Sequence, residues 1–195
     1  MKNHITTPEK IDYLVLLQGI NVGGKNSITM DELKKIFEKI KFTDIKTYIQ
    51  SGNVICKDSE KDTSKLTKRI EKTLLNTYKH KIKVTILTYS EIEDIINKMP
   101  NTFGKEDKKY KYDILFLMEP LTAEKIMQEI KPIKGNDKIY KGKGVCYVKR
   151  NSEKLTGSYI TQALKISPNI TVRNLNTTKK LYEIMLKRNE SKVQQ

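Results

Sequence analysis

The chain has 195 residues and is strongly basic, with 38 Lys and Arg residues against 23 Asp and Glu residues and a formal net charge of +15. Apolar residues make up 37 % of it, enough for a folded core, but none of their runs approaches the ~20 residues that cross a bilayer. This excludes an integral membrane protein. The polar N-terminal stretch argues against a secretion signal, so we expect a cytoplasmic protein without a membrane partner.

The first half of the chain predicts the element order βαββαβ, which is typical of ferredoxin-like folds. Short apolar runs predict four strands, at residues 11–18, 45–50, 53–57 and 82–88. Thr29 and Glu32 have the spacing of a capping box and predict the start of the first helix. Apolar side chains spaced by four residues predict a second helix over residues 63–79.

The turn between the second and third strands predicts the register of the first hairpin. A glycine there can supply positive φ, so residues 51–52 are expected to form a two-residue turn with Gln50 opposite Asn53. This register points Ile49 and Val54 toward the helices. It gives the opposite face of the hairpin the residues Tyr48, Gln50, Asn53 and Ile55. RNA-binding proteins of this fold stack bases on that face, but one tyrosine is a poor platform, so packing on the other half or on a partner is the alternative.

A short helix is expected at residues 90–99, capped by Ser90 with Glu93 three residues later. The polar and charged stretch 101–109 is the candidate boundary between two halves. We therefore expect a first ferredoxin-like half, a short helix with a linker, and a second half with a C-terminal helix, at residues 11–88, 89–109 and 110–190. The two halves could pack as one compact domain.

The second half repeats the same order and adds a helix. Strands are predicted at residues 110–118, 138–141, 144–149 and 169–173. Helices are predicted to begin at Thr122, at Ser152 and at Asn176, with the last one reaching about residue 187. The sequence thus predicts an α+β fold made of a duplicated ferredoxin-like unit, βαββαβ twice, with an extra C-terminal helix.

The stretch after the first strand holds one candidate site. Gly19, Gly24 and Lys25 satisfy most of the G-x-x-x-x-G-K pattern of a phosphate-binding loop. Asn26 replaces the hydroxyl residue that holds magnesium there, and the helix starts too late to face the phosphates, which argues against an NTPase. A simpler anion site remains, and its candidate residues are Asn21, Gly23, Gly24 and Lys25. The alternative is a loop whose glycines only shape the backbone.

A second candidate site lies where the last strand meets the last helix. The strand delivers Arg173 and Asn174 beside a helix start that carries Asn176, Thr177 and Lys179. Unpaired N–H groups, the helix dipole and the two cations would suit a phosphate or a carboxylate. The alternative is ordinary capping by Asn176 or Thr177, with Arg173 paired to a surface acid.

The sequence offers little material for metal binding or His-based catalysis. Cys56 and Cys146 each stand alone, and His4 and His80 are the only histidines. We therefore expect no metal site and no cofactor, and no His-centred catalytic triad. The two thiols are expected to pack as small apolar groups in a reducing compartment.

Three strings carry a resemblance to a known family: LLQGINVGGK at residues 16–25, TYIQSGNV at 47–54 and TVRNLNT at 171–177. In this order the chain resembles the bacterial domain-of-unknown-function 1697 family. The resemblance implies a cytoplasmic, uncharacterised α+β protein with a duplicated ferredoxin-like layout, and it implies no activity. Gln18 stands where the family usually has Arg, and Leu175 where it usually has Trp. An anion site at that Arg would therefore be weaker here and would depend on Lys25.

The leading hypothesis is binding of a phosphate-bearing ligand, either nucleic acid or a nucleotide-like small molecule, through the loop 19–25 and the helix start 173–179. Residues 101–195 carry 20 basic and 10 acidic groups and hold most of the excess charge that would attract a polyanion. The candidate contacts are Asn21, Gly23, Gly24, Lys25, Gln50, Ser51, Asn53, Arg173, Asn174, Asn176, Thr177 and Lys179.

Two alternatives stay open at this point. One is an enzyme without metal or histidine, whose polar pocket between the halves would use Gln50, Asn53, Arg173 and Asn174 to position a substrate. The other is an interaction or scaffold protein in which the three strings serve the fold. Because nearly all the cations are Lys, the basic charge can also reflect the coding bias of an AT-rich genome rather than a partner.

Overall fold

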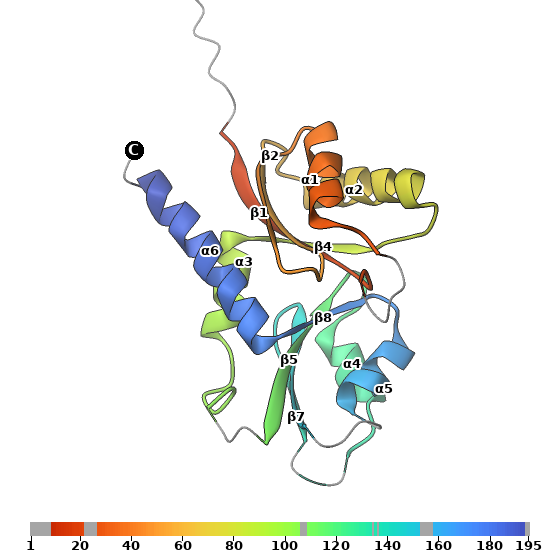
Figure 1. Cartoon of the computed structure of the whole chain (residues 1–195). Helices are drawn as coiled ribbons and strands as arrows, with labels where there is room; N and C mark the ends of the chain where they lie inside the picture. The colour runs from red at the N-terminus through yellow and green to blue at the C-terminus, as the bar shows by residue number, and fades with distance from the viewer. Residues whose placement is uncertain are drawn as a thin grey trace, which may run out of the picture.

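Figure 1 shows two four-stranded sheets, each with two helices against one face, and two further helices along one side of the molecule. The structure is a computed structural model that describes residues 9–21, 27–105, 109–133, 135, 137–152 and 158–193. The first part of the chain forms β1 (Ile11–Leu17), α1 (Met30–Lys39), β2 (Thr43–Tyr48), β3 (Asn53–Asp58), α2 (Thr63–Tyr78), β4 (Val84–Thr88) and α3 (Tyr89–Asn97). The second part forms β5 (Tyr110–Leu117), α4 (Ala123–Glu129), β6 (Lys138–Lys141), β7 (Val145–Asn151), α5 (Tyr159–Ile166), β8 (Ile170–Asn174) and α6 (Leu175–Val193).

Both sheets have the strand order of a ferredoxin-like unit. The order is β2-β3-β1-β4 in the first and β6-β7-β5-β8 in the second, and neighbouring strands run antiparallel. The registers are equivalent too, because Leu17 pairs with Val84 in the first sheet as Leu117 pairs with Ile170 in the second. The predicted α+β fold, a duplicated ferredoxin-like unit with a C-terminal helix, is confirmed.

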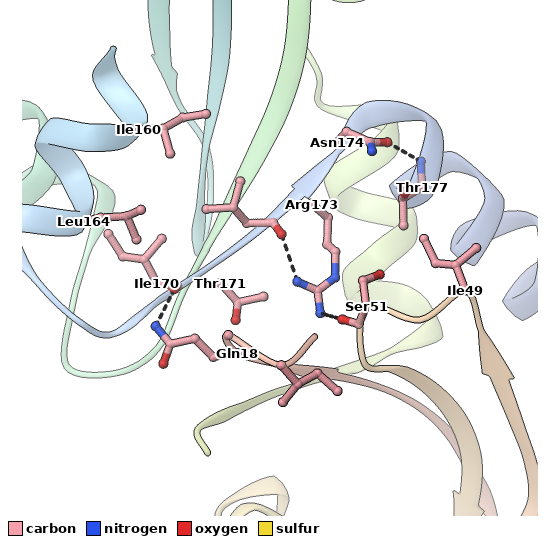
Figure 2. A pocket seen from close by; sticks show the side chains of 13 residues that line it. Gln18, Ile49, Ser51, Ile160, Leu164, Ile170, Thr171, Arg173, Asn174 and Thr177 are labelled. Carbon is pink, nitrogen blue, oxygen red and sulfur yellow. Dashed lines mark hydrogen bonds between the residues drawn. The ribbon is translucent and has the colours of Figure 1, made fainter. Parts of the chain in front are cut away.

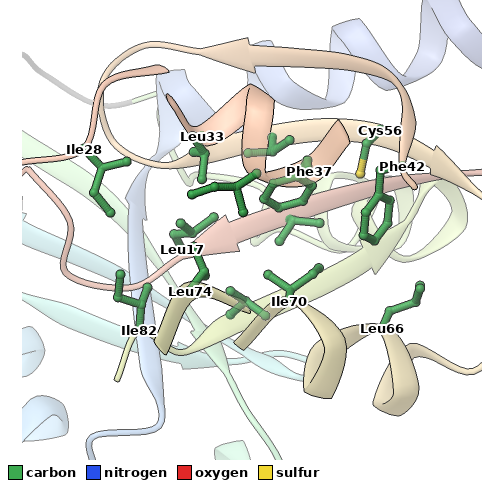
Figure 3. Packing of buried hydrophobic residues seen from close by; sticks show 14 of the residues in the cluster. Leu17, Ile28, Leu33, Phe37, Phe42, Cys56, Leu66, Ile70, Leu74 and Ile82 are labelled. Atoms are coloured by element: carbon green, nitrogen blue, oxygen red, sulfur yellow. The ribbon is translucent and has the colours of Figure 1, made fainter. Parts of the chain in front are cut away.

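Helices pack on one face of each sheet through apolar side chains spaced along a single helix stripe. In the first half Phe37 of α1 and Leu66 and Ile70 of α2 are fully buried against β1 and β3 (Figure 3). In the second half Ile126 of α4 and Ala163 of α5 are buried in the same way against β5 and β7. Each buried large aliphatic or aromatic side chain contributes about 1.5–3 kcal/mol to stability.

The opposite faces of the two sheets share a third cluster, here called the central cluster. It takes Leu14 and Ile55 from the first sheet and Phe116 and Tyr147 from the second, and α3 and α6 complete it. The Tyr147 hydroxyl donates to the Ile95 carbonyl of α3 at 2.8 Å. The face that stacks bases in RNA-binding proteins of this fold is therefore largely buried between the halves, as the alternative interpretation required.

The first hairpin differs from its predicted register. Tyr48, not Gln50, pairs with Asn53, so the turn has four residues, 49–52, and Ile49 is half-exposed at φ 46° rather than directed toward the helices. The Asn53 side chain determines this register, because its Nδ2 donates to the Tyr48 carbonyl at 3.0 Å and to Ser51 Oγ at 2.8 Å. A shift of two residues preserves the alternation of faces, so Tyr48 and Asn53 still point away from the helices.

Three helices begin at other residues than predicted. The cap of α3 is Thr88 with Glu91, because this pair has the same capping-box spacing as Ser90 with Glu93 and lies directly at the end of β4. Ser158 caps α5, whereas Ser152 lies in a turn where its hydroxyl donates to the Lys109 carbonyl. The last helix begins at Leu175 and reaches Val193, beyond the predicted residue 187.

Candidate functional site

A cavity of about 520 Å³ opens between the two halves and is called here the inter-half cavity (Figure 2). Its walls are the segment after β1, the β2–β3 turn, α5, β8 and the start of α6. The lining residues are Gln18, Gly19, Ile20, Ile49, Ser51, Ile160, Leu164, Ile170, Thr171, Val172, Arg173, Asn174 and Thr177. The cavity thus brings together residues more than 150 positions apart in the chain.

Arg173 crosses from the second half to the first. Its Nε donates to Asn53 Oδ1 at 2.6 Å, and its Nη2 donates to the carbonyls of Leu17 and Ser51, both at 2.8 Å. The side chain is only 8 % exposed. These bonds tie β8 to the end of β1 and to the β2–β3 turn, and they hold the guanidinium in one place at the cavity wall.

The Arg173 charge is not neutralised by a carboxylate within the described part of the chain. Burial lowers the pKa of its guanidinium to about 10, so the group still carries its positive charge at neutral pH. Nη1 donates to the Val172 carbonyl at 2.8 Å, which is one of the two hydrogen bonds that this nitrogen can make. A buried cation held by neutral acceptors is costly, and an anion beside it would offset that cost.

Thr171 supplies a second polar group to the same wall. It lies two residues before Arg173 in β8, so both side chains point to the same face of the strand. Thr171 is 1 % exposed, and its Oγ1 has no hydrogen-bond partner among the described residues. A buried hydroxyl without a partner costs about 1–3 kcal/mol, which a ligand acceptor in the cavity would recover.

The start of α6 completes this side of the cavity. Asn174 is the cap, because its Oδ1 accepts from the Thr177 N–H at 2.8 Å. The expected caps, Asn176 and Thr177, are therefore wrong: Thr177 lines the cavity at the third helical position, and Asn176 and Lys179 are exposed and do not line it. Arg173 is buried rather than paired to a surface acid.

Of the predicted contacts that the structure describes, Ser51, Arg173, Asn174 and Thr177 come together at the cavity, and the others lie elsewhere. Asn21 closes its own loop, with Nδ2 donating to the Ile28 and Gln50 carbonyls and Oδ1 accepting from the Ile28 N–H. Asn53 lies beneath the turn, where it holds Arg173, and the exposed Gln50 does not line the cavity. Gly23, Gly24 and Lys25 lie outside the described residues.

Several lining residues were not among the predicted contacts. Gln18 Nε2 donates to the carbonyls of Pro168 and Ile170 at 2.7 and 2.8 Å and joins the halves beside the cavity. Thr171 could have been found from its alternation with Arg173 along a strand. Ile160, which packs partly against the second-half core, and the exposed Leu164 are one turn apart on α5, and only the packing of the halves shows that they meet this wall.

The chemistry available at the cavity is recognition by charge, hydrogen bonds and apolar contact. The lining residues that the structure describes include no carboxylate, imidazole or thiol that could act as a general base or nucleophile. Both cysteines are buried elsewhere, and burial raises the pKa of the Cys146 thiol to about 12. Among the described residues no cluster of His, Cys, Asp and Glu could hold a metal ion, and no helix is long and apolar enough to cross a membrane.

Comparison with known proteins identifies the family but not an activity. The conserved bacterial protein SP0830 from Streptococcus pneumoniae has a similar solved structure, with a TM-score of 0.75 and 22 % sequence identity over 91 % of this chain and 99 % of that one. At this identity the likeness concerns the fold. No curated protein matches the sequence. The sequence model of the family described as "Protein of unknown function (DUF1697)" matches residues 11–147, and the chain therefore belongs to that family.

Proposed function

We propose that this protein binds a small phosphate-bearing ligand in the inter-half cavity. The observation that carries the proposal is the buried guanidinium of Arg173, which lines the cavity and has no carboxylate partner in the described part of the chain. The remaining N–H of Nη1 and the Thr171 hydroxyl would both donate to the phosphate oxygens. The start of α6, at Asn174 and Thr177, adds its positive dipole end.

The size of the cavity favours a small molecule over nucleic acid. Its volume of about 520 Å³ falls within the roughly 300–1,000 Å³ of typical small-molecule sites. A polyanion would instead spread its contacts over an exposed basic surface and bind with a steep salt dependence. Because Arg173, the strongest candidate contact, is buried at a concave wall, we favour a single nucleotide-like ligand.

The proposal concerns binding rather than catalysis. The described residues of the cavity wall supply donors and a positive charge but no general base, so they offer a bound phosphate ester no evident attacking or proton-accepting group. The two buried thiols suit a reducing compartment, which supports our proposal that the protein acts in the cytoplasm. Since the cavity needs both halves, we also propose that they act as one compact domain.

The test is thermal unfolding with pyrophosphate, ribose 5-phosphate, adenosine 5′-monophosphate (AMP) and a short single-stranded RNA. A phosphate ester at 100 times its Kd adds about 2.7 kcal/mol of stability, a rise in melting temperature of roughly 5–10 °C for a chain of this size. Binding of RNA alone, with a steep salt slope, would replace the small-molecule proposal with the nucleic-acid one.

A matched pair of variants locates the site. Thr171→Val removes the unpartnered hydroxyl at the cavity wall, and we expect about tenfold weaker binding together with a gain in stability of the ligand-free protein. Thr85→Val is the control, because Thr85 occupies the equivalent position of β4 and also has an unpartnered hydroxyl, but it does not line the cavity. Equal weakening by both variants would place the ligand elsewhere.

A further inference from the structure

We infer that the ligand of the inter-half cavity is a mononucleotide whose base lies on an apolar wall formed by Ile160 and Leu164, while its phosphate lies at Arg173 and Thr171 (Figure 2). The inference rests on the proposed function and names its ligand class. It assigns the role of specificity to α5, a helix that supplies no charged residue to the cavity lining.

The wall exposes one apolar side chain that core packing does not require. Leu164 is 44 % exposed, although Tyr159 and Ala163 of the same helix are buried against the second sheet. Ile160 lies one turn before Leu164, so the two side chains form a continuous strip along the cavity side of α5. Large exposed apolar side chains gathered at a cavity are typical of ligand contact.

The distribution of exposed apolar residues points to the same place. Four large apolar side chains are exposed in the described part of the chain: Ile49, Leu75, Met127 and Leu164. Ile49 and Leu164 line the inter-half cavity from opposite sides, with Arg173 between them (Figure 2). The cavity therefore has a cationic, hydrogen-bonding centre flanked by apolar walls, which suits a ligand with one anionic group and an apolar body.

Gln18 favours a base over an acyl chain at the apolar wall. Gln18 lines the cavity, and its Nε2 donates to the carbonyls of Pro168 and Ile170, while its Oε1 accepts no hydrogen bond from a described residue. An amide oxygen can accept a hydrogen bond from the amino group of a base, and an acyl chain has no such donor. The cavity therefore combines an apolar surface with one acceptor, Gln18 Oε1, that can bind the amino group at the edge of a base.

The experiment measures the affinities of AMP, ribose 5-phosphate and octyl phosphate by calorimetry on the full chain. We expect AMP to bind at least about tenfold more tightly than ribose 5-phosphate, a gain that one well-placed apolar contact supplies. Leu164→Ser should weaken AMP about fivefold or more and leave ribose 5-phosphate unchanged. Met127→Ser is the control, since Met127 is 38 % exposed on α4 and does not line the cavity.

The outcomes separate the two proposals. Equal affinities for AMP and ribose 5-phosphate, or tighter binding of octyl phosphate than of AMP, would overturn the assignment of a base to α5 while leaving phosphate binding in place. A loss of AMP affinity in Met127→Ser equal to that in Leu164→Ser would also overturn it. Failure of all three compounds to bind would overturn the proposed function itself.

Discussion

Two substitutions of Asn53 separate the structural role of Arg173 from its role as a charge. Asn53 Oδ1 lies 2.6 Å from Arg173 Nε, and its Nδ2 donates to the Tyr48 carbonyl and to Ser51 Oγ. Asn53→Ala removes the acceptor and adds no charge. Asn53→Asp keeps an acceptor at the same place and adds the negative charge that Arg173 otherwise lacks.

The two variants differ in stability. In Asn53→Ala both the Arg173 Nε–H and the Tyr48 carbonyl lose a partner, and at about 1–3 kcal/mol for each buried unpaired group the loss is roughly 2–6 kcal/mol. In Asn53→Asp the Ser51 hydroxyl can rotate to donate, so the Tyr48 carbonyl alone loses its donor. The new ion pair roughly balances the desolvation of its carboxylate, and the expected loss is about 1–3 kcal/mol.

For ligand affinity the two variants rank in the opposite order: Asn53→Asp should bind more weakly than Asn53→Ala. A carboxylate at residue 53 lies across the guanidinium from Nη1, about 6 Å from a phosphate bound there, and with an effective dielectric of about 20 the repulsion is about 3 kcal/mol. Asn53→Asp should therefore bind pyrophosphate about 100-fold more weakly than the natural protein. Asn53→Ala should retain its affinity within a few-fold wherever it remains folded, because the charge of Arg173 is unchanged.

Urea unfolding gives the stabilities and calorimetry at 15 °C gives the affinities, each on both variants and the natural protein. The reasoning predicts a crossed result, with Asn53→Ala the less stable variant and Asn53→Asp the weaker binder. If Asn53→Asp bound pyrophosphate as tightly as the natural protein, the charge of Arg173 would have no part in binding, and the residue would serve only to tie the halves together.

Further predictions concern the rest of the fold. Gly52→Ala should lower stability by more than about 2 kcal/mol in urea unfolding, because φ is +70° there and a Cβ would lie 2.8 Å from Leu17 Cβ. Hydrogen bonds from Ser64 lower the pKa of Asp62, the N-cap of α2. The ionised cap therefore stabilises the protein above about pH 4, and this stabilisation is lost as the pH falls through the lowered pKa. Asp62→Asn should reduce the stability lost between pH 7 and pH 3. The buried thiols, Cys146 with its raised pKa included, should react with a thiol reagent at pH 8 only on unfolding.

The parts of the fold that depend on neighbouring residues could be predicted from the sequence. The capping box of Thr29 with Glu32 and the buried stripe of α2 involve residues a few positions apart, and both are present. The predicted start of α3 was wrong, although a helix cap also depends only on neighbouring residues, because two overlapping capping boxes compete there. Thr88 prevails since its backbone already ends β4 in the extended conformation that a cap requires.

The site depended on contacts that no local pattern reveals. Asn53 and Arg173 are 120 residues apart, and their contact both determines the turn after β2 and creates the cavity wall. The sequence indicated a candidate site in each segment from its polar residues, but it could not show that the two segments meet. Nor could it show that Leu164 faces the cavity, since an exposed helix residue and a cavity-lining one have the same sequence pattern.

The duplication supplies an internal comparison for the proposed site. By strand register, Leu87 in β4 is the counterpart of Arg173, and Val145 in β7 is the counterpart of Asn53. Leu87 and Val145 pack in or against the central cluster, so an apolar pair at these positions is compatible with the fold. Apolar residues in place of a buried polar pair are often neutral or stabilising, which means that packing alone does not require Arg173 and Asn53. The polar pair joins the two halves at the cavity wall that Arg173 lines, whereas Leu87 and Val145 do not line the cavity, and this asymmetry supports a role in binding a ligand there.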